Sequence, residues 1–89
     1  MRTKHSPEAI NAVIRSAKAF KMFQEAVDKV EANIEELDPY WMMQYAILAH
    51  THYVQGRAYY VSARECRISD EALSLAAGGD VAELERLLL

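Results

Sequence analysis

The sequence predicts an all-α fold, in which a long antiparallel αα-hairpin is followed by a short pair of C-terminal helices. Small residues predict the hairpin, because alanine or glycine recurs at every seventh position in two separate segments. The two stripes are Ala12, Ala19 and Ala26, and then Ala49, Gly56 and Ala63. The composition is also that of a folded helical protein: 52% of the residues are hydrophobic, 26% are charged, and only three are glycine and two proline.

The two stripes also predict how closely the long helices pack. A fold-back point between Leu37 and Asp38 sets the stripes against each other in antiparallel order. The opposed pairs are then Ala26 with Ala49, Ala19 with Gly56, and Ala12 with Ala63. Side chains this small let two helix axes approach more closely than the usual separation of roughly 8 to 10 Å.

Four residues with strong N-cap preferences divide the chain into helices: Ser6, Asp38, Ser69 and Asp80. A proline follows each of the first two, at the first helical position that proline favours. The caps predict helices over about residues 7–36, 39–67, 69–77 and 80–88, within a single domain covering residues 1–89.

The sequence predicts a cytoplasmic protein of bacterial or phage type, with no membrane association. The N-terminus has no apolar run of the kind found in secretory signals. The most apolar window, residues 40–54, is interrupted by polar residues and is too short to span a bilayer. Cys66 is the single cysteine, so the chain has no internal disulfide, as expected in a reducing compartment.

Catalytic, metal and cofactor sites are not expected. His50 and His52 are two positions apart, whereas a helical metal-binding pair needs a spacing of three or four. Met42 and Met43 are interpreted as core filler, since no haem-attachment motif accompanies them. Cys66 lies beside two arginines but has no histidine placed to act as its base, so we interpret it as a free structural thiol and expect no enzyme activity.

His52 is expected to lie on the seam between the two long helices. It shares its stripe with Tyr45 and Tyr59, and the fold-back point places it opposite Phe23. We expect its imidazole to bond to a tyrosine or to water there.

One face of the second long helix combines basic and aromatic side chains at helical spacing. We call this set the basic–aromatic face and predict that it binds a partner: His50, Tyr53, Arg57, Tyr60, Arg64 and Arg67. Tyrosine and arginine supply much of the binding energy in protein interfaces. In the alternative interpretation, the C-terminal helices half-bury the tyrosines, and the arginines pair with Asp70, Glu71 or Glu83.

A second apolar stripe on the same helix predicts association. Ile47, Val54 and Val61 recur every seventh position, about 140° around the helix from the small residues, and we call them the outer stripe. The first long helix covers only the side with the small residues. The outer stripe must therefore be covered by the C-terminal helices, by a partner, or by a second copy; we favour a homodimer with a four-helix core.

Charge is divided along the hairpin. The distal end, residues 22–53, has one lysine against six acidic side chains, a net charge of −5. The open end, residues 1–21 and 54–67, has eight basic against two acidic side chains, or +6, and residues 68–89 carry −4. We expect the acidic C-terminal segment to fold onto the open end, and two hairpins to associate in antiparallel orientation.

The predicted function is that of a small cytoplasmic protein-interaction module, acting by protein binding as an adaptor, chaperone or stoichiometric inhibitor. The alternative is a nucleic-acid-associated regulator that uses the basic open end. Against the alternative stands the net charge of −3, because most nucleic-acid-binding domains are clearly basic.

Overall fold

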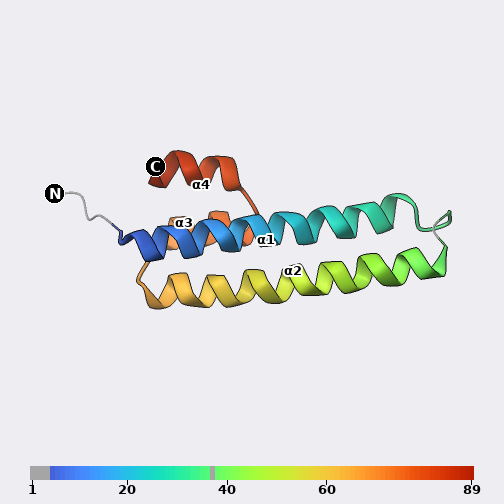
Figure 1. Ribbon diagram of the computed structural model, residues 1–89. Coiled ribbons are helices and arrows are strands. Elements are labelled where there is room, and N and C mark those ends of the chain that lie inside the picture. Colours follow the sequence, from blue (N-terminus) through green and yellow to red (C-terminus); the bar gives the residue numbers. More distant parts are fainter. Residues whose placement is uncertain (1–4, 37) are drawn as a thin grey trace.

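The computed structural model of the chain describes residues 5–36 and 38–89, which form four α-helices (Figure 1). Helices α1 (Pro7–Ala32) and α2 (Pro39–Glu65) run antiparallel along most of the 55 Å length of the molecule. Helices α3 (Asp70–Ala77) and α4 (Val81–Leu88) follow. The predicted all-α hairpin with a short C-terminal helical pair is confirmed.

The sequence located the helix starts correctly. In each predicted cap, a side-chain oxygen accepts a hydrogen bond of 2.8 to 3.2 Å from a backbone N–H two or three residues further on. The caps are Ser6, Asp38, Ser69 and Asp80. Each bond satisfies one of the backbone donors that the first turn of a helix leaves free.

The first long helix ends earlier than predicted. The expected end at residue 36 is wrong: α1 ends at Ala32, and residues 33–36 form turns. Asn33 terminates the helix by donating its backbone N–H to the carbonyl of Val30 and its side-chain amide to the carbonyl of Lys29. Residues 33–36 thus belong to the connection between α1 and α2 and not to the helix.

The predicted end of the second long helix at residue 67 is also wrong, because α2 ends at Glu65. Arg67 adopts a φ of 62°, in the left-handed region. Its N–H donates to the carbonyl of Arg64, and the N–H of Ile68 donates to the carbonyl of Ala63. These two bonds form a Schellman motif, which uses up the last carbonyls of the helix and turns the chain toward α3.

Close packing of the long helices is confirmed, because all six residues of the two small stripes are buried. A buried hydrogen bond of 2.8 Å joins the helices, from the hydroxyl of Ser16 to the carbonyl oxygen of Gly56. A Cβ placed on Gly56 would lie only 2.8 Å from two ring carbons of Phe20. The absence of a side chain at Gly56 thus lets the Phe20 ring lie directly on the backbone of α2.

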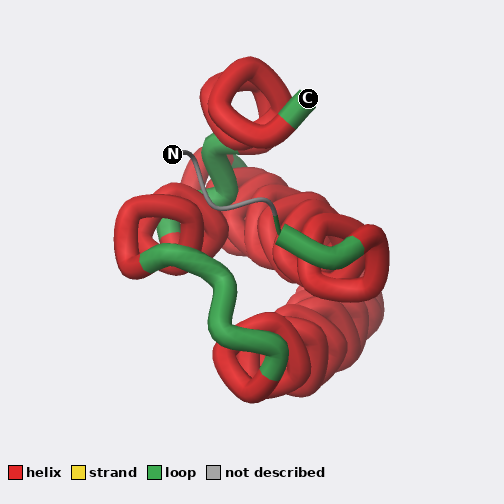
Figure 2. Tube along the Cα trace, turned by 90° about the vertical axis from the view of Figure 1, so that its left-hand side faces the viewer, coloured by secondary structure: helices red, strands yellow, loops and turns green. Residues whose placement is uncertain are grey.

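The C-terminal helices cover α1 at the open end of the hairpin. Figure 2 shows α1, α2 and α3 as a triangle, with α4 packed on α1 and α3 on the side away from α2. Buried residues of all four helices and of the loop after α2 form one core there: Ala9, Ala12, Val13, Ala17, Ala63, Ile68, Ala72, Leu73, Ala76 and Leu84. The acidic segment therefore folds onto the open end, as predicted.

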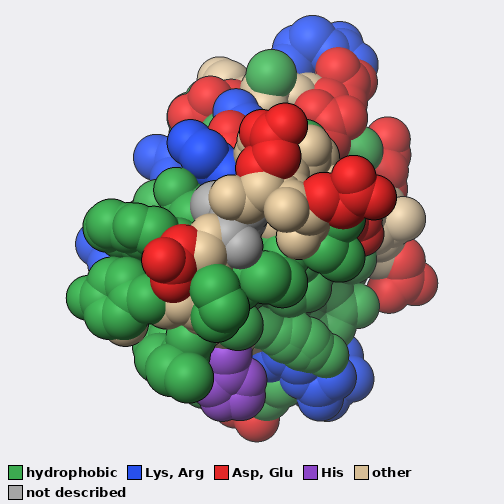
Figure 3. All heavy atoms as spheres, turned by 90° about the vertical axis from the view of Figure 1, so that its right-hand side faces the viewer, with side chains coloured by type: hydrophobic (Ala, Val, Ile, Leu, Met, Phe, Trp, Pro, Cys, Tyr) green, Lys and Arg blue, Asp and Glu red, His purple; other side chains and the backbone are tan. Residues whose placement is uncertain are grey.

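The distal end is built differently, as a layer only two helices thick. Among its described residues, only Ala26 and Ala49 are buried. Large apolar side chains there stay exposed: Met22, Ile34, Tyr40, Trp41, Met43, Ile47 and Leu48. Figure 3 shows hydrophobic side chains gathered over much of this end of the molecule. Two helices alone bury only the seam between them.

Candidate protein-binding face

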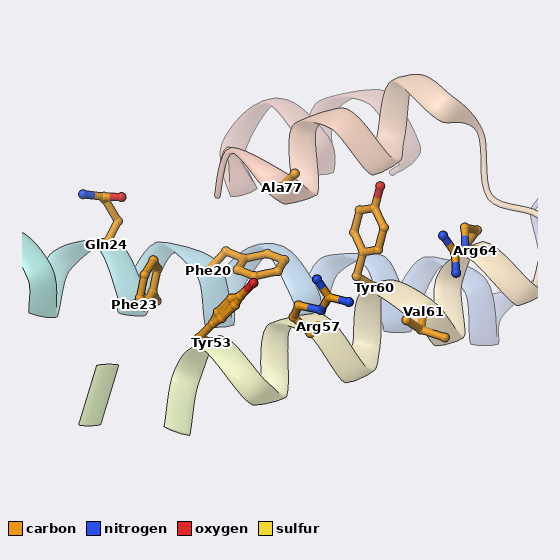
Figure 4. A pocket seen from close by; sticks show the side chains of 9 residues that line it. All are labelled: Phe20, Phe23, Gln24, Tyr53, Arg57, Tyr60, Val61, Arg64 and Ala77. Atoms are coloured by element: carbon orange, nitrogen blue, oxygen red, sulfur yellow. The ribbon is translucent and has the colours of Figure 1, made fainter. Parts of the chain in front are cut away.

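The structure brings four of the six residues of the basic–aromatic face to one pocket. The pocket has a volume of about 460 Å³ and opens between α1, α2 and the end of α3 (Figure 4). Its lining residues are Phe20, Phe23, Gln24, Tyr53, Arg57, Tyr60, Val61, Arg64 and Ala77. Because these residues come from three helices, the pocket exists only in the folded chain. We call it the aromatic–arginine pocket.

Edge-to-face aromatic contacts build one wall of the pocket. The ring centroid of Tyr53 lies 5.4 Å from that of Phe23 and 6.1 Å from that of Phe20, with interplanar angles of 74° and 80°. This geometry is the one that aromatic pairs prefer. The contact also corrects the expected seam: Phe23 meets Tyr53, whereas His52 was predicted to lie opposite it.

Tyr60 joins the pocket to the core of the open end. It is half-buried and packs against the core cluster while its ring also lines the pocket. Figure 4 shows its hydroxyl directed toward the C-terminal helices. Tyr53 and Tyr60 are both half-buried. The core cluster with its α3 and α4 residues covers Tyr60, as the alternative interpretation has it, whereas Phe20 and Phe23 of α1 contact Tyr53.

For the arginines, the alternative interpretation is wrong. Arg57, Arg64 and Arg67 are exposed, and across residues 5–36 and 38–89 the one ion pair joins Arg86 to Glu83 within α4. Helices α3 and α4 contact α1 more than α2, and among the described residues none of their carboxylates forms an ion pair with an arginine of α2. Arg57 and Arg64 thus present two uncompensated positive charges beside the aromatic wall.

The ion pair on α4 shifts the pKa of both partners: the hydrogen bonds raise the pKa of Arg86 and lower that of Glu83. Arg86 donates from Nε to Glu83 Oε2 at 3.0 Å and from a second nitrogen to Oε1. These hydrogen bonds stabilise the carboxylate and lower the pKa of Glu83 below its ordinary value of 4.5. Both side chains lie on the surface, so the pair is a local feature of α4.

Two predicted residues of the basic–aromatic face lie outside the pocket. His50 is exposed on α2 nearer its N-terminus than the pocket residues, and Arg67 is exposed in the turn that follows the helix. Sequence reasoning missed Phe20, Phe23, Gln24 and Ala77 as pocket residues. Phe20 and Phe23 contact α2 from the flank of α1, which the pairing of the small stripes could have indicated. Gln24 points away from α2 at the edge of the pocket (Figure 4), and the position of Ala77 depends on how α3 packs.

The outer stripe stays open along most of its length. Ile47 and Val54 are 55% and 53% exposed, whereas Val61 is half-buried and also lines the aromatic–arginine pocket. The C-terminal helices pack on α1 and on the open end of α2, so they do not cover Ile47 or Val54. The C-terminal helices are therefore excluded as the cover of Ile47 and Val54, which leaves a partner or a second copy.

His52 lies on the opposite side of α2 from the pocket, half-buried beside α1. Its Nδ1 is buried and has no protein partner among the described residues, so the hydrogen bond expected from a tyrosine is not formed. Tyr59 instead accepts a bond of 3.4 Å from Arg15, whose guanidinium lies 5.8 Å from the ring centroid.

Cys66 is exposed at the C-terminus of α2. Within the described ranges, no group of three histidine, cysteine or acidic side chains is arranged to hold a metal ion. No helix of the described chain is both long enough and apolar enough to cross a membrane. Comparison of the chain with protein-family models, with curated protein sequences and with solved structures finds no match.

Proposed function

We propose that the protein is a small protein-interaction module, which acts as an adaptor, chaperone or stoichiometric inhibitor by binding a partner at the aromatic–arginine pocket. The observation that carries the proposal is the pocket itself, where Arg57 and Arg64 stand without carboxylate partners beside Phe20, Phe23 and Tyr53. Aromatic and arginine side chains around a concave apolar surface are the usual composition of an interface hot spot.

The test compares partner capture by matched arginine variants. Arg57→Ala and Arg64→Ala each remove one exposed guanidinium from the pocket, while Arg15→Ala removes an exposed guanidinium on the opposite flank of the hairpin. We expect both pocket variants to lose a partner that the wild type and Arg15→Ala retain, at unchanged helical content. Equal capture by all four proteins would contradict the pocket as the binding site.

The second candidate is a nucleic-acid-associated regulator that uses the basic open end of the hairpin, which includes the exposed Arg57 and Arg64 of α2. It requires affinity that falls steeply with salt, with each lost arginine reducing the slope of the log–log plot by about one. We expect no gel shift with duplex or single-stranded nucleic acid at low salt, because the acidic distal end and acidic C-terminal helices repel a polyanion. A tight, salt-sensitive shift that Arg64→Ala weakens would favour the regulator.

The proposal includes self-association through the outer stripe. Ile47 and Val54 present an apolar face that no other part of the described chain covers, and burial of that face in a homodimer removes it from water. Sedimentation should give a mass near twice the 10.1 kDa of one chain. A monomer at all concentrations would contradict self-association while leaving the pocket proposal intact.

A further inference from the structure

The outer stripe continues beyond the three residues that sequence analysis identified. Tyr40 lies seven positions before Ile47, at the same angle of the helix within about 20°, and it is 59% exposed. Met43, also exposed, stands beside this row in the first turns of α2. The apolar face therefore runs from the first turn of α2 to Val61, where it borders the aromatic–arginine pocket.

We propose that a second copy of this chain covers this face in antiparallel orientation, with α2 packed against α2 around a two-fold axis at Val54. The inference rests on the proposed self-association and adds its geometry. In a two-fold interface, residue i meets residue j and j meets i. With Val54 on the axis, Ile47 of each chain packs against Val61 of the other.

The seven-residue spacing supports a helix as the occupant. Tyr40, Ile47, Val54 and Val61 recur at every seventh residue, as each of the two apolar rows of a heptad does, and such a row runs along the helix axis, where another helix can lie against it. At on the order of 100 Å² of exposed surface for each side chain, the row supplies about half of the roughly 800 Å² per partner that stable interfaces bury, and the side chains beside the row supply the rest.

Charge selects the antiparallel orientation. The distal end carries −5, and residues 54–67, the last part of α2 and the turn after it, carry Arg57, Arg64 and Arg67 against Glu65. In the antiparallel pair, the acidic distal end of one chain lies beside the basic segment of the other. A parallel pair would place the two acidic ends side by side, which like-charge repulsion disfavours.

The two ends of the hairpin also complement each other in packing. The distal end has no core beyond its seam, whereas the core cluster lies at the open end. Antiparallel association places the thicker end of each chain beside the thin distal end of the other. The second copy also adds Ile47 beside Val61, at the edge of the aromatic–arginine pocket, and so makes the pocket deeper in the dimer.

Cysteine cross-linking tests the orientation. All variants carry Cys66→Ser, which replaces an exposed thiol. An affinity-tagged Ile47→Cys chain is mixed with an untagged Val61→Cys chain under mild oxidation, and we expect the mixed disulfide to predominate. In the antiparallel dimer, position 47 of each chain lies beside position 61 of the other. Positions 47 and 61 of one helix are about 21 Å apart, so the two positions 47 are also about 21 Å apart. They cannot link with each other, since a disulfide needs Cα atoms within about 7 Å.

The control variants separate the inference from self-association itself. Val54→Glu should abolish the sedimentation dimer, whereas Gln55→Glu, an exposed neighbour turned by about 100°, should leave it unchanged. A dimer that links Ile47→Cys chains to each other, or that forms no disulfide at these positions, overturns the antiparallel contact alone. A monomer under all conditions overturns both the contact and the proposed self-association.

Discussion

The hydroxyl of Ser16 donates a hydrogen bond of 2.8 Å to the carbonyl oxygen of Gly56, forty residues away in the sequence and on the other long helix. Ser16 is fully buried, and it is the one buried polar side chain among the described residues. The Phe20 ring covers the same glycine, one turn further along α1. The hydrogen bond therefore fixes the register of α1 on α2.

Ser16→Ala should lower the free energy of unfolding by about 1 kcal/mol, the usual net value of one hydrogen bond. The variant removes the Ser16 hydroxyl itself, so no buried hydroxyl is left without a hydrogen-bond partner. Urea denaturation measures the change, and Ser62→Ala, at an exposed position on α2, is the control. Equal stability of both variants would contradict a register bond between the helices.

Gly56→Leu should destabilise the fold by about 1 to 3 kcal/mol, the range for overpacking. The new side chain collides with the Phe20 ring, which already lies within 2.8 Å of an added Cβ. Ala58→Leu adds bulk at an exposed position of the same helix and should change stability by less than about 0.5 kcal/mol. Thermal denaturation compares the two; an unchanged melting temperature for Gly56→Leu would disprove the close approach.

Leu84→Ala should detach the C-terminal helices from α1. Leu84 is the largest fully buried side chain, and truncation of such a leucine costs about 2 to 5 kcal/mol. Leu87, on the same helix, is 39% exposed, and Leu87→Ala should cost about 1 kcal/mol or less. Limited proteolysis reports the difference as faster cleavage after residue 65 in the Leu84 variant only.

Arg67→Gly should stabilise the protein by up to about 1 kcal/mol, because Arg67 holds a left-handed φ of 62° that costs a residue with a Cβ about 1 to 2 kcal/mol. The same change inside α2, Arg64→Gly, should lower stability by about 1 kcal/mol. Chemical denaturation of the two variants should show opposite signs. A loss of stability in both would mean that the Schellman motif does not determine the end of α2.

Glu83 should titrate below its ordinary pKa of 4.5, because the hydrogen bonds from Arg86 favour its charged form. A lowered pKa in the folded state means that the pair stabilises α4 at pH values above 4.5 and loses this effect as the pH falls through the lowered pKa. Carboxyl NMR titration measures the midpoint, and Arg86→Gln should raise it. An identical midpoint in both proteins would show that the pair does not form in solution.

The sequence predicted local features well, since they depend on neighbouring residues. The four caps and the small stripes follow from residue preferences within one or two turns, and all are present. The ends of α1 and α2 were placed two to four residues too late, because Asn33 and Arg67 form C-terminal caps without the glycine that usually marks them. The pairing of His52 with Phe23 failed because Tyr53 takes that position.

The pocket was only half predictable. Spacing on α2 identified Tyr53, Arg57, Tyr60 and Arg64, since residues of one helix face follow directly from its period. The opposing residues depend on the rotation of α1 about its axis and on the packing of α3. Whether the arginines form ion pairs depends on the side of the hairpin on which the acidic helices α3 and α4 pack. That is a property of the tertiary structure and does not follow from local sequence.

The unequal thickness of the hairpin predicts that its two ends open at different rates. Amide protons near Ala9, Ala63 and Leu73 lie in the four-helix core and exchange with solvent only when the whole protein unfolds. Those near Ala26 and Ala49 depend on a single seam, and local fraying from the turn releases them. Hydrogen exchange therefore locates the association surface, because a second copy that covers α2 as far as Ile47 and Tyr40 slows the exchange of distal amides.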